Sequence, residues 1–219
     1  MTGAARVLRL AVEVDLREVH RNLGYGRSGQ PREHIRRRIA ELWPRAIELL
    51  DPRGAVRVVR GEMAARAGMP DPSERVGIGL CTIGAGLEQE SQAASDRGEL
   101  LDALLLDGFG SAAAEATADA LEPHLCEHAA DRGLCAARRI SPGYGRWDVR
   151  GQRELLALLP ADELGIHLTS GMMMVPRKSV SFAVRFGESP GPPGQWKRCA
   201  HCNLVRCRYR RDEDGRDEH

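Results

Sequence analysis

The sequence LLDALLLDGFGSAAAEATADALEPHLCEH, residues 100–128, is rich in Ala and Leu and predicts one long helix. Gly108 and Gly110 mark a kink in this helix or a point of close packing. Pro123 lacks the amide hydrogen that a helix interior needs, so the helix is expected to break there. The patterns on either side of this stretch decide the fold class.

Runs rich in Val and Ile, or alternating in polarity, predict strands on both sides of the helix. They are residues 7–14, 55–59, 76–83, 166–174 and 179–186. The last two runs are expected to pair, and the final one places Val180, Phe182, Val184 and Phe186 on one face. Because strands and helices follow one another without regular alternation, we predict an α+β fold with a mostly antiparallel sheet.

Two further helices are predicted, at residues 32–50 and 152–159. Pro44 is expected to bend or divide the first of them. The arginines between Arg32 and Arg45 could form a basic patch. A solvated helix face is favoured instead, because glutamates at 33, 41 and 48 balance the charge.

Composition and glycine spacing argue against a nucleic-acid binder and against the two common nucleotide-binding loops. The chain has 32 Lys+Arg against 31 Asp+Glu, and only 4% of its residues are aromatic. This argues against a strongly basic nucleic-acid binder and against base-stacking platforms. Gly77, Gly79, Gly84 and Gly86 miss the spacing of both dinucleotide-binding and phosphate-binding loops.

The chain is expected to be cytoplasmic and to have no membrane segment. Residues 164–176 carry no Lys, Arg, Asp or Glu, but they fall short of the roughly 18–20 apolar residues that span a bilayer. Arg6, Arg9 and Glu13 interrupt the apolar start, so it does not resemble a signal peptide. The cysteines are therefore expected to stay reduced.

The character of the sequence changes after residue 187. Residues 1–187 carry the predicted α+β domain, and residues 188–196, rich in Pro and Gly, are expected to be a linker. Residues 197–211 are expected to form a cysteine-rich knuckle, and the charged residues 212–219 are expected to be disordered.

Cys199, Cys202 and Cys207 are candidate metal ligands, because a C-x-x-C pair can place two thiolates on one ion. His201 or a distant residue could complete a zinc site, and an iron–sulfur cluster fits the thiolates equally well. A redox dithiol and an inert tail stay open. A metal-binding tail would suggest an interaction protein, with nucleic acid an unlikely partner, or an electron-transfer protein.

Residues 139–144, RISPGY, could form a binding turn. Pro142 and Gly143 fix a turn that can hold Arg139 and Tyr144 toward one side. A guanidinium matches a carboxylate with two parallel hydrogen bonds. On these residues alone, a purely structural turn is favoured.

Glu115 is a candidate ligand contact, because its small neighbours in SAAAEA leave room for another molecule. Asp119 and Glu122 follow at i+4 and i+7, and on spacing alone a solvated acidic stripe is favoured. Arg177 and Lys178 could hold a phosphate or a carboxylate.

Taken in order, several segments resemble the activation domain of cobalamin-dependent methionine synthase, and small stand-alone proteins related to it. They are residues 22–25, 82–84, the helix around Glu115, 139–144, and the run from Leu168 through Pro176 to Ser181. The resemblance covers roughly residues 16–187.

The resemblance implies a curved α+β domain that binds S-adenosylmethionine and presents its methyl group to a corrinoid on another module or chain. By the same resemblance, Arg139 holds the carboxylate of the methionine moiety, and Glu115 contacts its cationic groups. Ser141, Gly143 and Tyr144 fall on ligand-contacting positions.

The resemblance further implies a role in reactivation. A cobalamin that has lost an electron regains a methyl group from S-adenosylmethionine and one electron, whose donor the sequence does not identify. Thr169-Ser170-Gly171 stands where the family usually has Thr-Glu-Ser, so one acid is missing.

Overall fold

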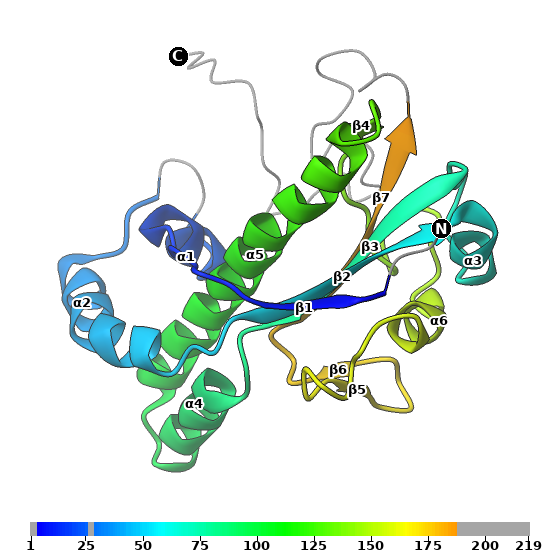
Figure 1. The fold of residues 1–219 in the computed structure, drawn as a ribbon. Helices are drawn as coiled ribbons and strands as arrows, with labels where there is room; N and C mark the ends of the chain where they lie inside the picture. The colour runs from blue at the N-terminus through cyan, green and yellow to red at the C-terminus, as the bar shows by residue number, and fades with distance from the viewer. Residues whose placement is uncertain (1–3, 26–28, 188–219) are drawn as a thin grey trace.

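The computed structural model describes residues 4–25 and 29–187, and within them it shows an α+β fold built on a curled antiparallel sheet (Figure 1). The strands lie in the order β1-β2-β3-β7-β4, and each neighbouring pair is antiparallel. Their bounds are β1 Arg6–Arg9, β2 Arg53–Arg60, β3 Arg75–Thr82, β7 Ser179–Gly187 and β4 Cys135–Ala136. The predicted fold class is confirmed.

One helix, α5, dominates the molecule and lies across one face of the sheet (Figure 1). Its first half is surrounded by α1, α2 and α4, whereas α3 and α6 pack on the other side of the sheet. The bounds are α1 Leu16–Asn22, α2 Glu33–Glu48, α3 Gly61–Arg66, α4 Gly86–Asp96, α5 Leu100–Ala130 and α6 Gly151–Ala157. No helix among the described residues is long and apolar enough to cross a membrane.

Glycines in the sheet bring α5 close to it. A Cβ added at Gly77 would lie 2.9 Å from Leu125 Cδ2, and one at Gly54 would lie 2.8 Å from Leu121 Cδ2. A Cβ at Gly79 would meet the ring of Phe182 at 2.4 Å. These glycines therefore serve packing, which agrees with the exclusion of nucleotide loops.

The prediction that Pro123 would break the long helix is wrong, because α5 continues through it to Ala130. Leu121 and Leu125, on either side of Pro123, are buried against the sheet. Their burial outweighs the single backbone hydrogen bond that proline removes. Likewise, α2 is not divided at Pro44, where Trp43 packs edge-on against Phe109 at 4.9 Å between ring centroids.

The predicted pairing of residues 166–174 with residues 179–186 is also wrong. β7 pairs with β3 and β4, with Gly79 opposite Phe182. The earlier segment instead forms a small separate hairpin, in which β5, His167–Leu168, pairs with β6, Met174–Val175. The alternation within β7 is confirmed, since Phe182, Val184 and Phe186 are buried in one cluster with α5.

Three arginines of α2 pair with acids, as expected for a solvated helix face. Arg36, Arg38 and Arg45 form ion pairs with Glu33, Glu41 and Glu48 respectively. Arg38 also holds Asp102 of α5, with its Nε 2.7 Å from Oδ1. This pair ties α2 to the long helix.

Candidate functional site

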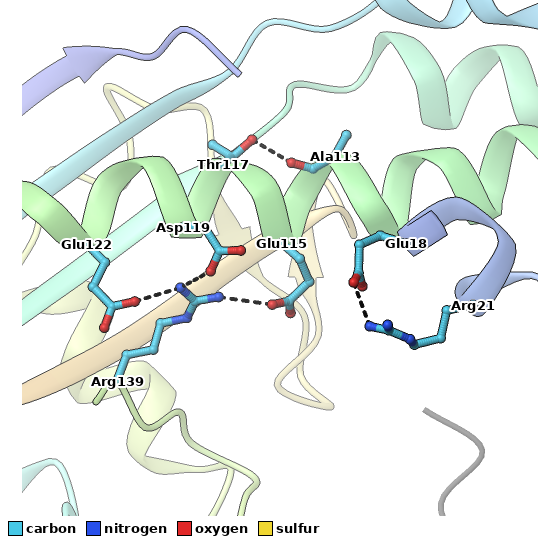
Figure 2. Close-up of polar contacts among 8 residues, drawn as sticks. All are labelled: Glu18, Arg21, Ala113, Glu115, Thr117, Asp119, Glu122 and Arg139. Atoms are coloured by element: carbon cyan, nitrogen blue, oxygen red, sulfur yellow. Dashed lines mark hydrogen bonds and ion pairs between the residues drawn. The ribbon is translucent and has the colours of Figure 1, made fainter. Parts of the chain in front are cut away.

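The segment after α5 returns along the open edge of β7, and this return places Arg139. The amide of Ala137 donates to the carbonyl of Arg185 at 2.8 Å. Ile140 and Ala183 exchange two backbone hydrogen bonds, of 2.9 and 2.8 Å. Arg139 therefore lies on a backbone fixed at both sides, with its side chain turned to α5 (Figure 2).

Three carboxylates of α5 surround the Arg139 guanidinium (Figure 2). Nη1 donates to Asp119 Oδ1 at 2.6 Å and to Glu122 Oε2 at 2.9 Å, and Nη2 donates to Glu115 Oε2 at 3.0 Å. We call Arg139, Glu115, Asp119 and Glu122 the Arg139 cluster. One positive and three negative formal charges leave it with an excess of two negative charges.

The guanidinium is almost buried, because only 9% of the Arg139 side chain is exposed. Its Cζ lies 5.7 Å from the centroid of the Phe182 ring. Burial lowers the pKa of Arg139, but the charges of Asp119, Glu115 and Glu122 outweigh burial and hold this pKa above its usual value. Arg139 is therefore a permanent, well-fixed cation.

The predicted turn at residues 141–144 is present. The amide of Tyr144 donates to the carbonyl of Ser141 at 3.2 Å, and Gly143 has a φ of +90°. Proline at the second position and a positive φ at the third define a type II turn. The Gly143 amide donates to the carbonyl of buried Trp147 at 2.8 Å, whereas 66% of the Tyr144 side chain is exposed.

Of the predicted site residues, the structure brings Glu115 and Arg139 into direct contact and places Ser141, Gly143 and Tyr144 in the adjoining turn. Their roles toward a ligand stay predictions. Sequence reasoning gave Asp119 and Glu122 no part in the site, although their i+4 and i+7 spacing from Glu115 was the signal that could have identified them. Their shared partner lies 17–20 residues away and is reached only through the fold.

Arg177 and Lys178, the other proposed anion ligands, hold carboxylates of the protein itself. Arg177 donates to Glu88 through Nε and through its backbone amide, each at 2.8 Å. Lys178 Nζ lies 2.8 Å from both Ser111 Oγ and Asp107 Oδ1. These contacts attach the start of β7 to α4 and α5.

The structure also shows a cavity that lies apart from the predicted site residues. A hollow of about 770 Å³ lies among β2, α3 and residues 72–75, and none of the predicted site residues lines it. Within residues 4–25 and 29–187, no group of three His, Cys, Asp or Glu side chains is arranged to hold a metal ion. Cys199, Cys202 and Cys207, with the predicted linker and tail, lie outside the described residues.

A search of solved structures finds a similar fold in the MetH reactivation domain bound to AdoHcy. The TM-score is 0.60 at 14% sequence identity, and the match covers 86% of this chain and 79% of that chain. At this identity the likeness shows the fold. No family model and no curated protein matches the sequence.

Proposed function

We propose that this chain binds S-adenosylmethionine and takes part in the reductive methylation of a corrinoid carried by another chain, such as a cobalamin-dependent methionine synthase. The observation that carries the proposal is the contact between Arg139 and Glu115, beside the turn at residues 141–144. A solved domain with this fold is bound to AdoHcy, which supports a ligand of the same chemical class for this chain.

The charges of the Arg139 cluster suit the ligand. S-adenosylmethionine carries one carboxylate, one ammonium and one sulfonium group. Arg139 offers the carboxylate a guanidinium with two-pronged geometry. The excess of two negative charges in the Arg139 cluster favours the two cations of the ligand.

In the proposed reaction the protein's contribution is position. An external donor would supply one electron to the corrinoid on the partner, and the reduced corrinoid would take the methyl group as the C–S bond of the ligand breaks, which leaves S-adenosylhomocysteine. This chain fixes the methionine moiety at Arg139, so that the sulfonium methyl is held in one orientation. The half-exposed Glu115 and exposed Tyr144 leave this side of α5 accessible to such a partner.

Isothermal titration with S-adenosylmethionine tests the proposal. The wild-type protein is expected to bind, and Arg139→Ala is expected to weaken binding at least tenfold, because it removes a charge-assisted contact worth about 1.5–3 kcal/mol. Arg45→Ala is the control, since Arg45 is 57% exposed near the end of α2. Absence of binding, or equal affinity of the Arg139 and Arg45 variants, would contradict the proposal.

A second proposed function concerns Cys199, Cys202 and Cys207. Their spacing supports a metal site in the tail, with zinc and an iron–sulfur cluster as the two candidates. A cluster there would make the chain an electron carrier as well as a methyl-donor module. A zinc knuckle would instead serve to bind a partner.

A further inference from the structure

The three carboxylates of the Arg139 cluster contact different nitrogens of the guanidinium. Asp119 and Glu122 share Nη1, at 2.6 and 2.9 Å, while Glu115 contacts Nη2 at 3.0 Å. Figure 2 shows Glu122 and Glu115 approaching the guanidinium from opposite sides. The two N–H groups of Nη1 therefore both have acceptors on the helix.

The acids also differ in burial. Glu122 is the least exposed, at 21% of its side chain, whereas Asp119 and Glu115 are 42% and 45% exposed. Together with the ring of Phe182, the two Nη1 contacts hold the buried guanidinium in one orientation. Glu115 is better placed to change partner, because Nη2 has no other acceptor among these three acids, whereas Nη1 is held by Asp119 and Glu122 together.

One edge of the guanidinium has a donor that no described residue uses. An arginine has five N–H donors, and its Nε–H and one Nη2–H point from the same edge with the spacing of a carboxylate. Among the described residues, Arg139 donates from Nη1 and Nη2 and not from Nε. With Nη1 anchored, this Nε–Nη2 edge has a fixed direction.

We infer that Asp119 and Glu122 are positioning residues that hold Nη1, so that the Nε–Nη2 edge of Arg139 receives the carboxylate of the ligand. Glu115 is the exchangeable partner, which leaves Nη2 and turns to the ligand's cationic groups. This inference rests on the proposed function. It assigns separate tasks to three acids that differ little in type or spacing.

The test compares two ligands on the full chain: S-adenosylmethionine, and its decarboxylated analogue, which keeps the sulfonium and the amine. Asp119→Asn and Glu122→Gln are expected to weaken S-adenosylmethionine about tenfold and the analogue less than twofold. Loss of negative charge affects the cations of both ligands equally, so the comparison isolates the carboxylate. Glu115→Gln is expected to weaken both ligands by similar factors.

Glu127→Gln is the matched control, because Glu127 lies on the same helix with 74% of its side chain exposed. A merely structural role for Asp119 or Glu122 would weaken both ligands equally and overturn the inference. Tighter binding of S-adenosylmethionine by these variants would also overturn it, by showing that the acids compete with the ligand. If Glu122→Gln fails to fold, the half-exposed Asp119 carries the same comparison. A wild-type protein that binds neither ligand would overturn the proposed function itself.

Discussion

His20 of α1 is a partly exposed residue with one polar atom shielded from solvent. Its Nε2 is buried and has no hydrogen-bond partner among the described residues, and its ring lies edge-on to Tyr25 at 6.3 Å. Burial and the nearby charge of Arg36 lower its pKa, while Asp15 opposes the shift. The folded protein therefore binds this proton less tightly than the unfolded chain, whose histidine has a pKa of about 6.5.

The contribution of His20 to stability is complete above pH 6.5 and is lost as the pH falls below that value. We expect the melting temperature of the wild type to decrease between pH 7 and pH 5.5, and to decrease less in His20→Gln. The melting temperature of His20→Gln will still decrease with falling pH, because burial also lowers the pKa of His128. Thermal unfolding followed by circular dichroism measures both curves, and identical slopes would contradict the expectation.

At the scale of elements, glycines of β3 make room for α5 at Gly77 and for the Phe182 ring of β7 at Gly79. A Cβ at Gly79 would lie 2.4 Å from Phe182 Cζ, and the Phe182 ring also lies under the guanidinium of Arg139. Gly79→Ala is expected to destabilise the protein by about 1–3 kcal/mol, the usual cost of overpacking. Denaturant unfolding measures this change.

Gly171→Ala is the control for this prediction, because the nearest atom to its added Cβ is Thr169 Oγ1 at 3.9 Å. We expect no destabilisation there. The double variant Gly79→Ala with Phe182→Leu should recover part of the loss, since the smaller side chain makes room for the methyl group. A neutral Gly79→Ala would show that the ring moves without cost.

At this scale, the sequence predicts features that depend on neighbouring residues and fails for features that depend on contacts between distant segments. The alternation in β7 and the Val-rich run in β3 are local patterns, and both strands form where predicted. The pairing of residues 166–174 with β7 failed because strand order is set by contacts across the whole chain. Pro123 failed as a helix end for the same reason, since the sheet beneath α5 decides its length.

In the candidate site, too, local features could be predicted from the sequence and contacts between distant segments could not. The turn at residues 141–144 follows from Pro142 and Gly143 alone, and its geometry could be predicted. The partnership of Arg139 with α5 could not, because the acids and the arginine are joined by the return of the chain along β7. Separately, each acid resembles a solvated surface residue.

At the scale of the molecule, all the described helices and strands lie at or before residue 187. β7 lies between β3 and β4 and ends at Gly187, so the sheet, α5 and the Arg139 cluster all precede the predicted linker. We therefore expect a protein truncated after Gly187 to keep the wild-type affinity for S-adenosylmethionine and a cooperative unfolding transition. The metal content predicted for Cys199, Cys202 and Cys207 should disappear with the tail.

Titration calorimetry, thermal unfolding and elemental analysis of anaerobically purified protein, compared with the full chain, measure these three properties. A full-length Cys199→Ser variant separates loss of the thiolate from loss of the tail. If truncation abolishes S-adenosylmethionine binding while Cys199→Ser does not, part of the binding site lies beyond residue 187 and the predicted domain boundary is wrong. If both changes abolish S-adenosylmethionine binding, binding at the Arg139 cluster depends on the Cys199 thiolate. The predicted metal site of the tail and the Arg139 cluster are then coupled, although they lie far apart in the sequence.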